Sequence, residues 1–156
     1  MRTDTLYPYW EMIHLELLDE VSMFTPEQIE AAPNAGSQSL RQIVVGFAAQ
    51  ERFQIAHLVG GNRYDRPATS EYVTSADLLD LLKTTRQITD RVLEPISKTS
   101  LASVRTLPAN LELNRHATNV PVAWLIWDVL HQEITCLGRI RQRFEDQGWL
   151  RLRRRP

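Results

Sequence analysis

The sequence predicts an all-α fold, a four-helix bundle with a long crossover connection before the last helix. Four segments carry apolar residues at helical spacing, and breaks that contain Pro, Gly and Asn separate them. No segment combines sustained apolar/polar alternation with enrichment in β-branched residues. The chain has 156 residues, which is enough for one domain with its own core. We expect this domain over residues 1–150 and a basic tail over 151–156.

The first two long helices are expected over residues 6–24 and 40–59. Ile13, Leu17 and Val21 place one apolar stripe along the first helix. Thr25 and Pro26 then begin a short helical turn, because threonine is a good N-cap and proline fits the first helical position. Ser37 or Ser39 caps the second helix, and Gly60 and Gly61 end it.

The third helix is expected over residues 75–93, after a capping box formed by Thr74 and Asp77. The fourth is expected over 121–147, with proline at its start and Gly148 at its end. Residues 98–119 join the two. Neighbouring antiparallel helices are usually joined by short loops, so this long connection indicates a crossover.

The composition is that of a soluble globular protein, with 43% hydrophobic and 24% charged residues. A net charge of −1 gives no indication of nucleic acid or of an anionic membrane as partner. One cysteine cannot form an internal disulfide, and we expect a reducing cytoplasm. No stretch is long and apolar enough for a membrane span, and the N-terminus lacks the apolar run of a secretion signal. The arginine-rich tail is interpreted as solvated rather than as a nucleic-acid contact.

The last helix carries an unusually broad apolar arc. At about 100° per residue, half of its circumference is apolar, through Val122, Ile126, Val129, Leu130, Ile134, Leu137, Ile140 and Phe144. Leu125 and Cys136 lie at one edge of this arc and Trp127 at the other. Trp124 lies on the polar side. A helix with so wide an arc contacts more than one neighbour or a second subunit, and we expect a homodimer.

Glu133 lies inside this apolar arc. A buried carboxylate must be paired, hydrogen-bonded or neutralised, because burying it alone costs several kcal/mol. The preferred interpretation is an ion pair with an arginine of another helix, such as Arg52 or Arg86. The alternative is a catalytic general acid or base with a raised pKa.

Cys136 is the other candidate catalytic residue. It is interpreted as a small core residue rather than a reactive thiol, because no base lies on its own helical face. His131 points to the opposite side of the helix. His14 and His57 are expected to be partly exposed, and His116 falls in the long connection without a partner that can be named.

Two segments resemble the signatures of the DinB/YfiT-like family. Residues 39–51, SLRQIVVGFAAQE, resemble its second-helix pattern S-[apolar]-x-x-x-[apolar]-x-H-[apolar]-x-x-x-E. Residues 130–140, LHQEITCLGRI, resemble its last-helix pattern, roughly H-E-x-x-H-x-G-x-[apolar]. The resemblance implies the family's four-helix bundle and extends over nearly the whole chain in the order of its elements.

In that family three histidines commonly bind a divalent metal, one from the second helix and two, four residues apart, from the last. The corresponding residues here are Gly46, Gln132 and Cys136, none of which is histidine. We therefore expect a pocket at these positions without a bound metal or other cofactor. If an ion were bound, the donors to consider would be Cys136, Glu51, Glu133 and His131.

The resemblance implies a stress-associated or DNA-damage-associated protein. We expect a dimer that has lost the metal centre and binds a small molecule or a protein partner. The alternative is a metal-dependent transferase that uses a low-molecular-weight thiol such as bacillithiol, or a related hydrolase or isomerase, acting in the same inter-helix pocket.

Overall fold

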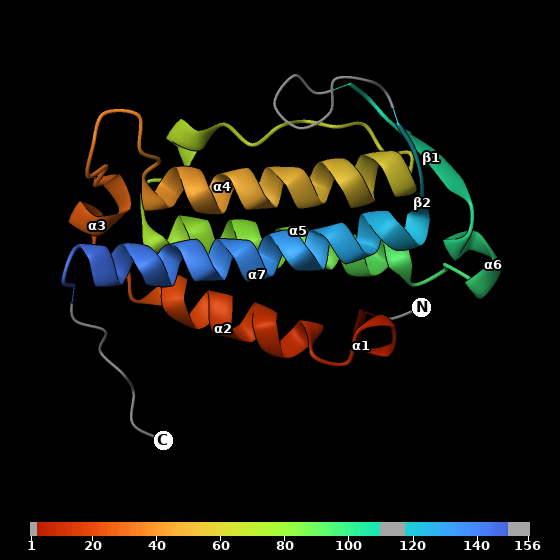
Figure 1. Cartoon of the computed structure of the whole chain (residues 1–156), viewed down its shortest axis with the longest axis horizontal. Helices are drawn as coiled ribbons and strands as arrows, with labels where there is room; N and C mark the ends of the chain where they lie inside the picture. The colour runs from red at the N-terminus through yellow and green to blue at the C-terminus, as the bar shows by residue number, and fades with distance from the viewer. Residues whose placement is uncertain (1–2, 110–117, 150–156) are drawn as a thin grey trace.

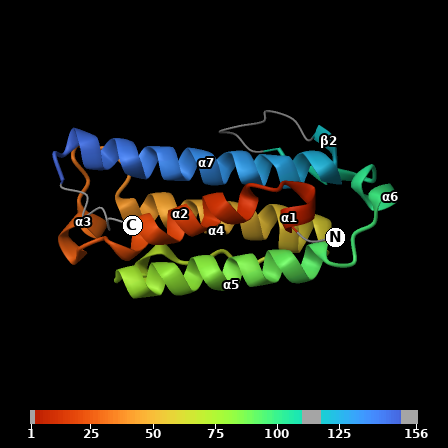
Figure 2. The ribbon, with the colours of Figure 1, turned by 90° about the horizontal axis from the view of Figure 1, so that it is seen from below.

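A computed structural model describes residues 3–109 and 118–149. Its core is formed by the four long helices, which confirm the all-α bundle (Figure 1). These are α2 (Trp10–Ser22), α4 (Leu40–Glu51) with its continuation η1 (Arg52–Val59), α5 (Ser75–Leu93) and α7 (Val122–Asp146). Both α2 and α4 pack against α5 and α7, so α2 lies diagonally opposite α4 (Figure 2).

The starts of the helices follow from local hydrogen bonds. The predicted capping box begins α5 at Thr74, and a second capping box begins α4 at Ser39, one of the two serines expected as its cap. Thr25 caps the short helix α3 (Pro26–Glu30) in the same way. Gly61 follows η1 with a φ of +70°, a conformation that glycine adopts without the strain of a side chain.

The first predicted helix is interrupted. A short helix, α1 (Thr3–Leu6), precedes a turn, and α2 begins only at Trp10. The second predicted helix runs to Val59 as expected, but its last eight residues form the π-helix η1. Two other short helices are η2 (Thr69–Glu71) and α6 (Lys98–Leu101).

The connection before α7 contains secondary structure that the sequence analysis missed. Strands β1 (Val104–Leu107) and β2 (Thr118–Pro121) pair antiparallel, with Val104 opposite Pro121. Each strand has four residues, which is too short for alternation to stand out in the sequence.

This connection is long, as predicted, but it joins α5 and α7 at the end of the bundle where α5 ends and α7 begins, and its described elements α6, β1 and β2 lie near that end (Figure 1). Helices α5 and α7 are diagonally opposed. The connection that runs along the bundle is instead residues 60–74, which link the parallel helices α4 and α5 (Figures 1 and 2). The crossover expected before α7 is therefore found before α5. The length of a connection can be read from the sequence, but whether it crosses along the bundle depends on the directions of the two helices, which are determined by packing.

The core is apolar with a polar cluster at its centre. Trp10, Leu17, Leu40, Leu82 and Ile126 are among the fully buried apolar side chains. Several polar and charged side chains are also buried, among them His14, Glu51, Thr85, Arg86, Thr89 and Glu133. No helix within the described residues is sufficiently long and apolar to cross a membrane.

Candidate functional site

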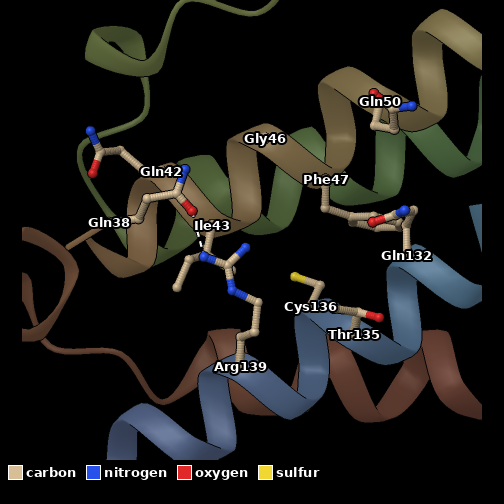
Figure 3. A pocket seen from close by; sticks show the side chains of 10 residues that line it. All are labelled: Gln38, Gln42, Ile43, Gly46, Phe47, Gln50, Gln132, Thr135, Cys136 and Arg139. Carbon is tan, nitrogen blue, oxygen red and sulfur yellow. Dashed lines mark hydrogen bonds between the residues drawn. The ribbon is translucent and has the colours of Figure 1, made fainter. Parts of the chain in front are cut away.

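The neighbouring helices α4 and α7 line a cavity of about 190 Å³ (Figure 3). It contains the three positions that the sequence resemblance aligns with metal ligands of the DinB/YfiT-like family, so the structure brings Gly46, Gln132 and Cys136 together. The other lining residues are Gln38, Gln42, Ile43, Phe47, Gln50, Thr135 and Arg139. We call this space the α4/α7 cavity.

The walls of the α4/α7 cavity are formed by residues that are spaced by one or two helical turns on each helix. On α4, Gln42, Gly46 and Gln50 are spaced by four and share one face. On α7, Gln132 and Arg139 lie two turns apart. Carboxamide groups therefore line both walls, and each can donate and accept hydrogen bonds.

Arg139 closes one end of the cavity. Its Nη2 donates a hydrogen bond to Gln38 Oε1 over 2.5 Å, and the two side chains meet at the cavity wall (Figure 3). Arg143, one turn further along α7, donates to the backbone carbonyls of Gln38 (2.8 Å) and Ala31 (3.3 Å). Helix α7 thus holds the segment before α4 in place.

Cys136 is a buried thiol that is protonated at neutral pH. Burial, reinforced by the negative charge of Glu133, raises its pKa to about 12, although the nearby Arg139 acts in the opposite direction. The side chain is 4% exposed. A thiol in this state is a poor nucleophile, because the thiolate is the reactive form.

Glu133 belongs to the centre of the bundle and is absent from the lining of the α4/α7 cavity. Its carboxylate accepts hydrogen bonds from Trp10 Nε1 (2.6 Å), His14 Nδ1 (2.7 Å) and Arg86 Nη2 (2.6 Å). The predicted ion pair with Arg86 is confirmed, whereas Arg52 donates to Thr85 instead.

The pKa of Glu133 is shifted in the direction that favours its charged form. Burial acts to raise this pKa, but the hydrogen bond from His14 and the charge of Arg86 outweigh burial and lower it. The raised pKa required for a general acid is therefore not found. Glu133 is a counter-ion of Arg86, whose Nη2 lies 2.6 Å from its Oε2.

Glu51 shares the same arginine with Glu133. It accepts a 2.7 Å hydrogen bond from Thr89 Oγ1, and Arg86 Nε lies 3.4 Å from its Oε1. Burial raises the pKa of Glu51, and the Arg86 charge offsets this only in part. The Arg86 guanidinium also lies over the Trp10 ring, 4.6 Å from its centroid.

Trp10, His14 and Thr89 also belong to this cluster, and the sequence does not predict their membership. His14, which was expected to be partly exposed, is 4% exposed. One signal was present, because Trp10, His14, Leu17 and Val21 follow a helical repeat and so share one face.

The remaining histidines lie away from the cavity. His131 is exposed and stacks on Trp127 with a ring distance of 5.3 Å and an interplanar angle of 1°. His57 is exposed, as expected in part, and its Nδ1 lies 2.8 Å from the Asn62 carbonyl oxygen. His116 and the arginine-rich tail lie outside the described residues.

Gly46, Gln132 and Cys136, which the resemblance aligns with metal ligands, do not fit a histidine-bound divalent ion. Gly46 has no side chain, Gln132 offers an amide, and Cys136 offers a thiol whose raised pKa opposes metal binding. Within residues 3–109 and 118–149, no group of three or more His, Cys, Asp or Glu side chains is arranged to hold an ion.

Neither a protein-family model nor a curated protein matches the sequence. Among solved structures, the chain is similar to a DinB-like protein from Bacillus cereus ATCC 10987, with a TM-score of 0.73. The match covers 94% of this chain and 93% of that chain at 9% sequence identity. At this identity the likeness concerns the fold alone. The chain therefore has the fold of a DinB-like protein.

Proposed function

We propose that the α4/α7 cavity binds a small polar molecule and that it does so without a metal ion. One observation carries the proposal. The three positions that would hold a metal meet in one cavity, yet most polar groups around it are carboxamides, which suit hydrogen bonding to a ligand better than coordination of zinc or nickel. Small-molecule sites commonly combine an apolar floor with a few polar groups, and Ile43 and Phe47 supply such a floor here.

The alternative function, a thiol-dependent transferase, has less support. A transferase of this kind needs a group that stabilises the thiolate of its cosubstrate. The Cys136 thiol has a raised pKa, and Glu133 is occupied by Arg86, His14 and Trp10. Arg139 is the remaining charged group on the cavity wall among the described residues.

Metal analysis of the purified protein tests the proposal. Protein prepared without added metal should contain far less than one equivalent of zinc, nickel or manganese per chain. Its thermal midpoint should not respond to these ions, because ligand binding to the native state would raise it. A tightly bound equivalent of any of the three would contradict the proposal.

Turnover assays separate the two functions. The protein is incubated with bacillithiol and an aromatic chloride electrophile, and the thioether product is measured. We expect the uncatalysed rate. A rate above this background that Cys136→Ser abolishes would support the transferase instead.

The proposal also includes a homodimer and production under stress. The dimer is supported by exposed apolar side chains on α2 and α7, such as Met12 and Ile134. The association with stress or DNA damage rests on the sequence resemblance alone. It is tested by measuring transcript levels in the source organism before and after treatment with a DNA-damaging agent.

A further inference from the structure

We infer that the ligand of the α4/α7 cavity is a small organic anion whose carboxylate is recognised by Arg139. This inference rests on the proposed function and adds the chemical class of the ligand. Among the described residues that line the cavity, Arg139 is the charged one, and no carboxylate faces it across the cavity. The cavity therefore has a positive end.

The bonding of Arg139 differs from that of Arg86 and Arg141, although Arg52 and Arg143 also donate to neutral groups. Arg86 is paired with Glu133, and Arg141 is paired with Glu16 and Glu20. Within the described part of the chain, Arg139 makes no ion pair, and its hydrogen bond goes to the neutral amide of Gln38. A guanidinium binds a carboxylate more strongly than an amide, because that hydrogen bond is charge-assisted and can be bidentate.

A carboxylate ligand would thus exchange places with the Gln38 amide. The Gln38 backbone stays fixed in this exchange, because Arg143 holds its carbonyl oxygen independently over 2.8 Å. Only the side chain has to turn away. Gln38 therefore competes with the ligand for the same guanidinium.

The rest of the cavity defines the rest of the ligand. Gln132 lies seven residues from Arg139, which is about 10 Å along the helix axis, and Gln50 faces the same cavity from α4. These amides suit a second polar group at the far end of the ligand. A volume of about 190 Å³ restricts the ligand to a compact molecule, such as one of the size of glutarate.

Glutarate and its uncharged analogue glutaramide are matched probes for this inference. Isothermal titration measures both with the wild-type protein and with Arg139→Gln and Arg141→Gln. Arg141 is the control because it lies on the same helix but pairs with carboxylates of α2 and does not line the cavity. Each of the two variants removes one positive charge. We expect the wild type and Arg141→Gln to prefer glutarate by roughly tenfold or more, as for a charge-assisted bond. Arg139→Gln should lose this preference.

A further variant tests the competition. Gln38→Ala removes the amide that occupies Arg139, so it should bind glutarate more tightly than the wild type does. Circular dichroism confirms that each variant is folded, and Arg139→Lys, which keeps the charge, should retain a preference for glutarate.

The outcomes distinguish this inference from the proposed function. If glutaramide binds as well as glutarate, the cavity is a small-molecule site but the anion assignment is overturned. Equal losses in Arg139→Gln and Arg141→Gln would also overturn it, because they would indicate a general effect of charge. If neither probe binds at millimolar concentration, both the inference and the proposed function are rejected.

Discussion

Arg86 interacts with two buried carboxyl groups, and its contact with Glu133 is closer than its contact with Glu51. Its Nη2 donates to Glu133 over 2.6 Å, whereas its Nε lies 3.4 Å from Glu51. One guanidinium cannot neutralise two carboxylates at these depths, so the group with the better hydrogen bonds keeps its charge. This explains why the pKa of Glu133 is lowered while that of Glu51 is raised.

Replacing Glu133 with glutamine should strongly destabilise the fold. The carboxylate accepts three hydrogen bonds, and the Arg86 charge would lose its counter-ion. We expect Glu133→Gln to lower the free energy of unfolding by about 3 kcal/mol, the cost of breaking a buried ion pair. Urea denaturation measures this. The control is Glu11→Gln on the exposed side of α2, which should change it by less than about 0.5 kcal/mol. Equal effects would contradict the structural role.

Glu51 should make the stability depend on pH in a defined direction. A carboxyl group whose folded-state pKa is raised contributes stability that is fully present below the unfolded pKa and is lost as pH rises through the folded pKa. For Glu51 the loss begins above its ordinary pKa of 4.5. The variant Glu51→Gln mimics the protonated form and keeps an acceptor for Thr89.

The difference in unfolding free energy between Glu51→Gln and the wild type should therefore increase in favour of the variant from pH 4.5 to pH 8. Urea denaturation at several pH values measures it. Glu133 acts oppositely, since its lowered pKa contributes stability that is lost on acidification, but it is present in both proteins and cancels. A difference that stays constant with pH would show that folding does not raise the pKa of Glu51.

Part of the buried cluster around Glu133 could be predicted from the sequence. Glu133 on an apolar face predicts a buried partner, and Arg86 was one of two candidates. The sequence did not predict that His14 and Trp10 would complete the cluster, because periodicity assigns residues to a face but gives no distances between helices. The role of Gln38 was unpredictable as well, since it depends on a segment held by Arg139 and Arg143.

At the scale of elements, the helices of the bundle followed from caps and periodicity. Helix α5 was predicted with its bounds, because Thr74 and Asp77 define its start and Pro95 limits its end. The predicted apolar arc of α7 is partly wrong. Ile134 lies in the predicted apolar arc yet is 48% exposed, because an arc that covers half the circumference is wider than the surface that α2 and α4 cover.

The α4/α7 cavity should accept a metal site if the missing ligands are supplied. A Cβ atom built on Gly46 meets no heavy atom within 4 Å, so a side chain has room there. We expect the combined variant Gly46→His, Gln132→His, Cys136→His to bind nickel or zinc and to gain about 2.7 kcal/mol of stability at a metal concentration 100 times Kd.

Thermal denaturation with and without nickel measures this gain. The control carries Gln132→His and Cys136→His without Gly46→His, and it should respond less because the ligand from α4 is absent. If the triple variant folds but nickel does not raise its thermal midpoint, the three positions are not close enough to bind one ion.

At the scale of the molecule, the bundle was predictable but the path of the chain was not. Four amphipathic segments require a shared core, whichever way each helix runs. The parallel orientation of α4 and α5 depends on which faces fit together, and the sequence pattern contains no such information. The pattern therefore does not indicate that residues 60–74 run along the bundle.

Large apolar side chains lie exposed on two adjacent helices. Tyr9, which directly precedes α2, and Met12 of α2 are 70% and 53% exposed, and Trp127 and Ile134 of α7 are 46% and 48% exposed. Ion pairs between Arg141 and both Glu16 and Glu20 join these flanks of α2 and α7. Met12 precedes Glu16 by one turn and Ile134 precedes Arg141 by two, so each lies on the same flank as its charged neighbour. We call these four residues the α2/α7 apolar surface.

We predict that a second copy of the chain covers the α2/α7 apolar surface. A two-fold contact buries the same side chains on both subunits, and about 800 Å² per subunit is ordinary for a stable dimer. Sedimentation velocity at micromolar concentration should give twice the chain mass of 18.0 kDa. Met12→Asp combined with Ile134→Asp should give monomers, because a carboxylate is costly in an apolar interface. The control Val104→Asp changes a residue that is 56% exposed on β1, and it should remain dimeric. A monomeric wild type would refute the prediction.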